Sequence, residues 1–206
     1  MGWGRGWAGG LSFPLDFGGG VRAMTLDRPM TLDEFLAWEE RQEARFEFDG
    51  FGPVAMTGGT VLHSIIQGNL VTALHGRLRG GPCRVFGGNL KIVVAERVRY
   101  PDAFVVCSPQ AGAATVARDP VVVFEVLSPG TSRTDRITKA REYGATESIQ
   151  RYVILEQGAQ AATVFARRNG IWAGVVVEGD AVLDMPEIGI GVPLAELYVD
   201  VGFSEE

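Results

Sequence analysis

Two acidic residues stand in or against apolar runs, and this placement constrains the fold more than any other feature of the chain. Asp102 follows Arg99-Tyr100-Pro101, and Glu125 lies inside the run Val121–Leu127. Short runs of β-branched and aromatic residues are typical of buried strands. An unpaired buried charge is strongly unfavourable. We therefore expect two successive core strands whose carboxylates share a partner, for which a divalent cation with oxygen ligands is the simplest candidate.

Composition excludes some classes of protein. The length of 206 residues suits one domain. A hydrophobic fraction of 46% and a charged fraction of 21% are typical of a globular protein, and no apolar run reaches the roughly 18 residues of a membrane-spanning helix. The net charge of -6 argues against a broad nucleic-acid-binding surface, but it leaves room for a local basic groove.

The cysteines and the first residues give further expectations. Cys83 and Cys107 make neither a disulfide framework nor a CxxC metal motif, so we expect reduced thiols and a cytoplasmic location. Residues 1–23 are rich in glycine and lack strand or helix periodicity, which predicts a flexible extension. Met24 opens the more protein-like part, and we hypothesise that it is the biological start, which an intact mass of the native protein would test. Residues 24–206 are then expected to form one domain.

Periodicity predicts an α/β domain with a mixed sheet. Thr31, with Glu34 three residues later, has the pattern of a capping box at a helix start. Helical patterns continue from this cap to Trp38 and recur at 63–78, at 134–145 and, in a short form, at 193–197. Strand patterns cover 46–49, 54–56, 84–86, 90–95, 103–107, 121–127, 152–156, 162–167 and 171–178.

The chemistry of the two acids suits Mg²⁺. Two carboxylates with water can hold this ion, which also binds phosphate oxygens and can activate water against a phosphodiester. Glu47, on the strand at 46–49, is a third acid that could join them. The alternatives stay open: Glu125 pairs with a buried arginine, Asp102 caps a turn, and Glu47 with Asp49 belongs to an exposed hairpin.

Three basic residues are candidates for the same site. Lys139, on the helix after the Glu125 strand, could position a water or neutralise a phosphate. The alternative is a solvated helix face, and Lys91 on an earlier strand is its rival. His63 could be a base or a substrate contact, although a capping or surface histidine is the simpler interpretation.

Taken together and in order, several segments resemble a large bacterial family of restriction-endonuclease-like proteins, the Uma family, long treated as a domain of unknown function. These segments are Phe46-Glu47-Phe48-Asp49-Gly50, His63 with Asn69-Leu70, Arg99-Tyr100-Pro101-Asp102, Glu125-Val126-Leu127-Ser128-Pro129, Thr131, Asp135, Lys139, Tyr143 and Tyr152. The family in turn resembles the PD-(D/E)XK nucleases. The resemblance implies a restriction-endonuclease-like fold, with helices flanking a mixed sheet, and Mg²⁺-dependent cleavage of DNA, in which Mn²⁺ could substitute.

The same resemblance assigns roles to residues. It implies that Asp102 and Glu125 are metal ligands, that the carbonyl of Val126 is a third ligand and that Glu47 assists. The superfamily lysine is expected two residues after the second acid, where this chain has Leu127. Because the family pattern has its lysine at the position of Lys139, the resemblance favours a lysine that has moved to the next helix.

We therefore expect a Mg²⁺-dependent DNA endonuclease with Asp102, Glu125, Lys139 and Glu47 in its catalytic site. A homodimer would suit double-strand cleavage, and no membrane partner is expected. The first alternative is a noncatalytic binding module, favoured by Leu127 and the acidic net charge. The second is a two-carboxylate hydrolase of sugars. A Lys139 ammonium more than about 6 Å from the carboxylates would argue against catalysis, since a proton contact spans roughly 3 Å or one water.

Overall fold

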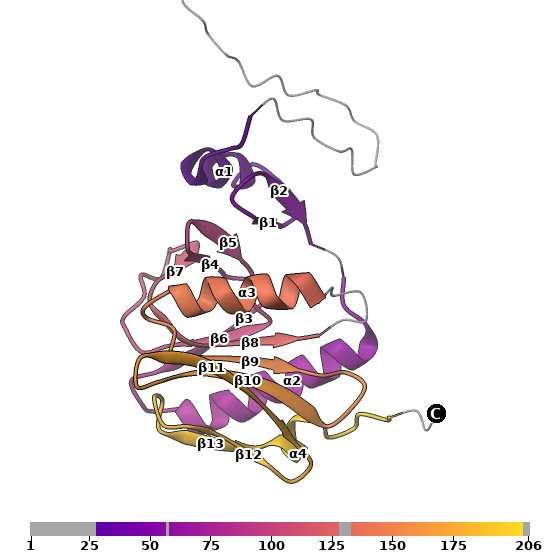
Figure 1. Cartoon of the computed structure of the whole chain (residues 1–206). Helices are drawn as coiled ribbons and strands as arrows, with labels where there is room; N and C mark the ends of the chain where they lie inside the picture. The colour runs from indigo at the N-terminus through magenta and orange to yellow at the C-terminus, as the bar shows by residue number, and fades with distance from the viewer. Residues whose placement is uncertain (1–27, 57, 128–132, 204–206) are drawn as a thin grey trace, which may run out of the picture.

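The computed structural model describes residues 28–56, 58–127 and 133–203, with the side chains of α3 described from Arg136 onward (Figure 1). The expected extension at 1–23, Met24, Ser128-Pro129 and Thr131 therefore lie outside the described residues. In chain order the elements are α1 (Leu32–Glu39), β1 (Phe46–Phe48), β2 (Pro53–Ala55), α2 (Val61–Leu78), β3 (Arg84–Gly87), β4 (Lys91–Val94), β5 (Arg97–Arg99), β6 (Ala103–Val106), β7 (Val116–Ala117), β8 (Pro120–Val126), α3 (Arg133–Ala145), β9 (Arg151–Leu155), β10 (Ala161–Arg168), β11 (Ile171–Glu178), β12 (Val182–Met185), β13 (Ile190–Pro193) and α4 (Leu194–Leu197).

The larger sheet is mixed, as the sequence predicts. Its six strands have the order β11-β10-β9-β8-β6-β3. The β8–β9 pair is parallel and the other neighbours are antiparallel. Parallel neighbours need a crossover connection, and α3 supplies it on one face while α2 covers the opposite face (Figure 1). The sheet therefore forms the middle layer, with Phe124 and Val126 in the core beneath α2 and Val123 in the core beneath α3.

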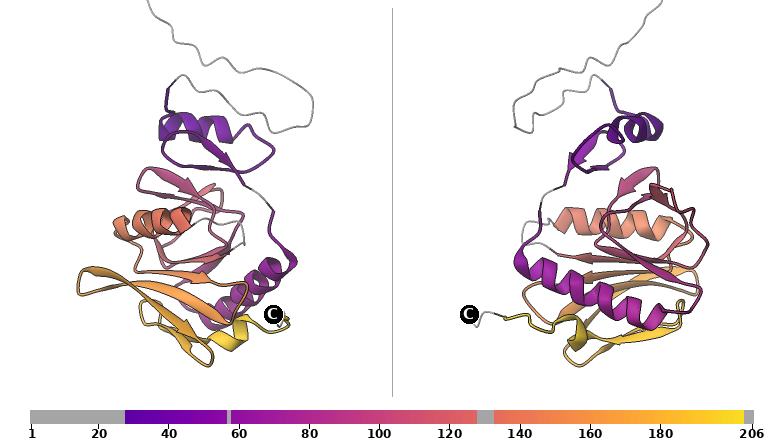
Figure 2. Two further views of the ribbon diagram at one scale, coloured as in Figure 1. Left: turned by 45° about the vertical axis from the view of Figure 1, so that its right-hand side comes forward. Right: turned by 180° about the vertical axis from the view of Figure 1, so that it is seen from behind.

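The chain also forms a second sheet, of five strands. It has the order β2-β1-β5-β4-β7, and α1 packs on it through Phe35, whose ring stacks on Phe48 at 4.9 Å between centroids. The expected capping box of Thr31 and Glu34 is present at the start of α1. Figure 2 shows α1 with the β1–β2 hairpin at one end of the molecule and α4 with β12 and β13 at the other.

The two large sheets are joined at Tyr100-Pro101-Asp102. β5 belongs to the five-stranded sheet and ends at Arg99, while β6 belongs to the six-stranded sheet and begins at Ala103. Proline cannot donate to a strand ladder, so the pairing of β5 is not continued through Pro101. The consequence for function is that Asp102 lies at the seam between the two sheets.

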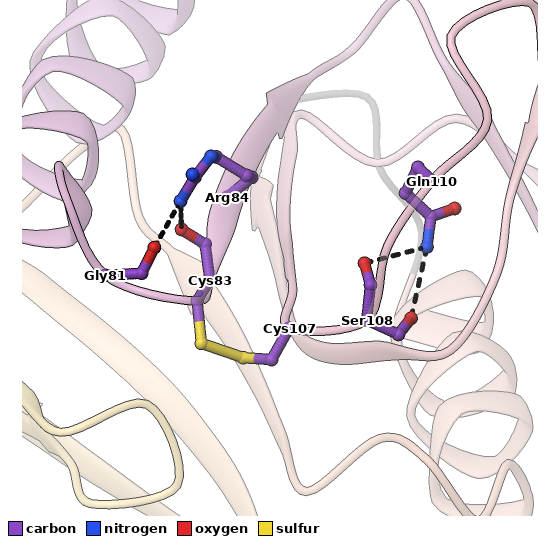
Figure 3. Close-up of a disulfide and its surroundings, with 6 residues drawn as sticks. All are labelled: Gly81, Cys83, Arg84, Cys107, Ser108 and Gln110. Atoms are coloured by element: carbon purple, nitrogen blue, oxygen red, sulfur yellow. Dashed lines mark hydrogen bonds between the residues drawn. A yellow bond between two sulfur atoms is a disulfide. The ribbon is translucent and has the colours of Figure 1, made fainter.

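The two cysteines are paired, which corrects the expectation of reduced thiols. Cys83 precedes β3 and Cys107 follows β6, and the antiparallel register sets Arg84 opposite Val106. This register brings the two sulfurs together in a disulfide, although 24 residues separate them in sequence (Figure 3). The bond therefore clamps the edge strand β3 to β6, the strand that follows Asp102.

Candidate active site

Asp102 is held by three hydrogen-bond donors at the seam. Nε2 of His63 lies 2.8 Å from Oδ1, and Nε2 of Gln67 donates to the same oxygen at 3.3 Å. The backbone N–H of Val126 donates to Oδ2 at 2.7 Å. An ionised carboxylate only accepts, so Nε2 of His63 carries the hydrogen. Asp102 is thus fixed by α2 on one side and by β8 on the other, rather than by a turn.

Glu125 faces α3 from the middle layer. Side chains alternate along a strand, so Glu125 points to the face opposite Phe124 and Val126. Its Oε1 accepts from Nζ of Lys139 at 3.1 Å and from the hydroxyl of Tyr143 at 3.0 Å. Lys139 and Tyr143 are four residues apart on α3 and therefore share a helix face. The partner of Glu125 is thus a lysine and a tyrosine, not the arginine of the alternative interpretation.

The electrostatics of Glu125 reflect burial and its neighbours. Burial is the main cause that raises its pKa to about 7. The Lys139 ammonium opposes this shift, while the charges of Asp102 and Glu47 add to it. The pKa of the Tyr143 hydroxyl is also raised, first by burial and then by the charge of Glu125. Negative charge in the cluster is therefore only partly compensated by Lys139.

Glu47 reaches the same cluster from the second sheet. Its Oε1 lies 3.5 Å from Nζ of Lys139, and its Oε2 accepts from Nη1 of Arg99 at 3.2 Å. Glu142 on α3 holds the buried Arg99 guanidinium through two hydrogen bonds of 2.8 Å. Asp49, in contrast, accepts from two backbone N–H groups of the hairpin turn. Glu47 thus lies beside Lys139 with the other acids, and Asp49 serves the turn.

The structure also separates the lysine candidates. The Lys139 ammonium lies 3.1 Å from Glu125, well inside the separation of about 6 Å beyond which a role for Lys139 at the acids would be doubtful. Lys91 is only 4% exposed and donates to Glu39 at 2.5 Å, away from the acids of the site. Leu127, at the position of the expected lysine, packs with its side chain against the core beneath α3.

The donor set fits a hard cation. Asp102, Glu125 and the carbonyl of Val126 offer oxygen, the ligand that Mg²⁺ prefers, and this ion usually keeps several waters and takes only one or two carboxylates. Within the described ranges, no three side chains of Asp, Glu, His or Cys converge closely enough to hold a metal by themselves. A cation at these residues would therefore need water molecules as further ligands.

Sequence reasoning missed two of the contacts to the acids. His63 has the simpler interpretation of a cap or surface residue, yet it binds Asp102, and Gln67 had no predicted role. Both lie on one face of α2 because four residues separate them. A pair of polar residues at this spacing on an otherwise apolar helix face is the signal that was available.

Comparisons with known proteins agree with this architecture. The family model Uma2, described as "Putative restriction endonuclease", matches residues 32–195. An uncharacterized protein of Synechocystis sp. is 30% identical over 178 residues, which cover 84% of this chain and 94% of that protein. A crystal structure described as "a putative nuclease belonging to DUF820" from Anabaena variabilis aligns with a TM-score of 0.70 and 21% identity, over 83% of this chain and 98% of that one. The expected restriction-endonuclease-like fold is thereby confirmed.

Proposed function

The chain belongs to the Uma2 family of restriction-endonuclease-like proteins, and on that premise we propose that it is a Mg²⁺-dependent endonuclease that hydrolyses DNA phosphodiester bonds. One observation supports this function more than the alternative functions. The ammonium of Lys139 lies 3.1 Å from Glu125 and 3.5 Å from Glu47. A lysine from α3 is thus present beside the acids even though Leu127 stands two residues after Glu125.

Asp102, Glu125 and the carbonyl of Val126 are the groups that would hold the cation. When bound, Mg²⁺ (or Mn²⁺ in its place) supplies positive charge that polarises the phosphodiester and lowers the pKa of a water. Lys139 provides a point charge that orients the attacking water or offsets charge that develops on the phosphate. Glu47, anchored by Arg99, holds the ammonium of Lys139 in place.

Partners and location follow as parts of the same proposal. DNA is the substrate, and two copies of the chain would supply the two sites that double-strand cleavage uses, which sedimentation of the purified protein tests. The described helices lack the combination of length and apolar character that a membrane span requires. The expected cytoplasmic location rests on reduced thiols, which the Cys83–Cys107 disulfide contradicts; we retain the location as a proposal that the redox state of Cys83 in cells tests. We also propose a single functional domain over residues 24–206, which limited proteolysis tests.

Cleavage of plasmid and single-stranded DNA with Mg²⁺ or Mn²⁺ tests the function directly. Wild type should cut and Asp102→Ala should not, because the variant lacks the carboxylate at the seam. A crystal soaked in Mn²⁺ should show the ion between Asp102 and Glu125. A site without Mn²⁺ at millimolar concentration, together with DNA left intact by wild type, would favour a noncatalytic binding module.

A further inference from the structure

We propose that His63 is a positioning residue that fixes the Asp102 carboxylate for a divalent cation, an inference that rests on the proposed function. A carboxylate has about four acceptor positions. Asp102 gives three of them to His63, Gln67 and the N–H of Val126. These contacts hold the plane of the carboxylate and leave about one acceptor position for a metal. His63 therefore holds Asp102, the metal ligand, and is not itself a ligand.

The second ring nitrogen of His63 indicates that the ring acts through Asp102. Nδ1 is buried and has no hydrogen-bond partner among the described residues. A histidine that exchanged a proton with substrate through this nitrogen would need it open to substrate or water. Since Nε2 is taken by Asp102 and Nδ1 is enclosed, neither nitrogen is presented to a substrate.

The local packing leaves the ring little freedom. A Cβ added to Gly59 would lie 2.9 Å from Cγ of His63, closer than real Cβ contacts come. A Cβ added to Gly88 would lie 3.2 Å from Nε2 of Gln67, which is also tight. Glycine at these two positions thus lets the backbone approach the imidazole and the amide that hold Asp102.

The start of α2 is also tied to the end of β8. Oγ1 of Thr60, the cap of α2, accepts from the N–H of His63 at 3.1 Å. The Thr60 hydroxyl donates to Oε1 of Gln157 at 2.7 Å, and Nε2 of Gln157 donates to the carbonyl of Leu127. This chain of contacts links His63 to the strand that carries Glu125. Support of this kind around a metal ligand keeps the site in its binding geometry.

The expected effect is on metal affinity. Loss of a residue that orients a metal ligand typically costs 10–100-fold in affinity, so His63→Ala should weaken Mn²⁺ binding by about that factor. His63→Gln should recover most of the affinity, because its amide Nε2 can donate as the imidazole does. A role in folding alone would not produce this recovery. The matched control is His75→Gln, an exposed histidine on the same helix, which should bind Mn²⁺ like wild type.

Titration of the full chain with Mn²⁺, followed by the electron paramagnetic resonance of the free ion, measures these affinities without DNA. Asp102→Ala sets the level of nonspecific binding. If wild type exceeds that level and His63→Ala equals wild type or binds more tightly, the role of His63 is overturned while the proposed function stands. If Mn²⁺ binding by wild type does not exceed binding by Asp102→Ala, both the role of His63 and the proposed function are overturned.

Gly59→Ala provides a second variant that keeps the imidazole. The added methyl displaces the ring from its place, so Mn²⁺ affinity should fall although every polar group is retained. Circular dichroism and thermal unfolding establish that the variant is folded. Unchanged Mn²⁺ affinity in folded Gly59→Ala would contradict the positioning role.

Discussion

Two Glu–Lys pairs of this chain, one buried and one part-buried, differ in their charge balance. Glu39 accepts from the Lys91 ammonium at 2.5 Å and from the Tyr100 hydroxyl at 2.7 Å, and these three residues are 7%, 4% and 8% exposed. Glu125 shares the Lys139 ammonium with Glu47 and also feels the charge of Asp102. The first pair is complete, with one charge of each sign. In the second cluster Lys139 faces both Glu125 and Glu47, and the Arg99 that also binds Glu47 is already paired with Glu142.

This difference in charge balance means that loss of a charge has different consequences in the two places. A complete buried pair loses most when one partner is removed, because the other charge is left without compensation. A cluster with surplus negative charge gains when positive charge is added, since burial and like charges raise the pKa of Glu125. The Glu39–Lys91 pair is therefore sensitive to the loss of either partner, and under the proposed function a cation would offset the negative charge around Glu125.

Removal of Glu39 should have the largest effect on stability. Glu39→Ala leaves the buried Lys91 ammonium without its partner, and such losses cost about 3–5 kcal/mol in free energy of unfolding. Urea unfolding measures this loss. Mn²⁺ affinity of the folded variant should stay close to wild type. The double variant Glu39→Leu with Lys91→Met should recover much of the stability, and a failure to recover any of it would break the comparison.

Removal of Lys139 should affect activity more than stability. Lys139→Met removes the charge beside Glu125 and should slow cleavage of DNA by about 10²–10³-fold, as loss of one preorganised electrostatic contact does. Stability should fall less than in Glu39→Ala, because Glu125 can take up a proton when the ammonium is gone. Cleavage at the wild-type rate by the variant would show that Lys139 has no catalytic role.

Removal of the disulfide should lower stability without changing Mn²⁺ binding at the candidate site. The double variant Cys83→Ser with Cys107→Ser opens a loop between residues 24 apart in sequence, for which chain entropy predicts a loss of about 3.5 kcal/mol. Both cysteines pack with the core beneath α2, whereas Glu125 binds residues of α3, so Mn²⁺ affinity of the folded variant should not change. Thermal unfolding and the Mn²⁺ titration measure the two effects, and a matching drop in affinity would contradict this separation.

Neutralisation of Glu125 should give the smallest effect and the opposite sign. The pKa of Glu125 is raised from 4.5 to about 7, so the folded state binds its proton more tightly than the unfolded state does. The contribution of this group to stability therefore falls as pH rises from 4.5 to about 7. Glu125→Gln should be more stable than wild type by about 1–2 kcal/mol near pH 8, and this advantage should vanish near pH 5.

The free energies of unfolding of wild type and Glu125→Gln are measured near pH 5 and near pH 8, without added metal. Glu147→Gln, a substitution in the loop after α3 and outside the cluster, is the matched control and should show no such dependence. A variant less stable than wild type near pH 8 would mean that the Lys139 contact outweighs the burial of Glu125.

Local signals predicted most of the regular elements. The Thr31 cap, α2 and the β10–β11 hairpin with its turn at Asn169-Gly170 lie where periodicity and turn residues place them. The sequence did not reveal β5, β7, β12 and β13, which have only two to four residues each. Short strands form because partners from elsewhere in the chain pair with them, and that pairing leaves little trace in local sequence.

The contacts of the candidate site also fall into those that the sequence predicts and those that it does not. Glu125 and Lys139 are joined by one strand-to-helix connection, so their meeting could be expected from sequence. The contact between His63 and Asp102 spans 39 residues and depends on how α2 crosses the sheet. The disulfide depends on the register of β3 and β6. These features are set by tertiary packing, which a single sequence without its structure does not specify.

Under the proposed function, a cation would join Asp102, at the seam between the two sheets, to Glu125 on the neighbouring strand β8. Asp102 closes the connection from the five-stranded sheet, and Glu125 belongs to the six-stranded sheet. A ligand that binds only the folded state adds RT ln(1 + [L]/Kd) to stability, about 2.7 kcal/mol at 100 times Kd. If the proposed site binds Mn²⁺, saturating Mn²⁺ should therefore raise the melting temperature of the chain.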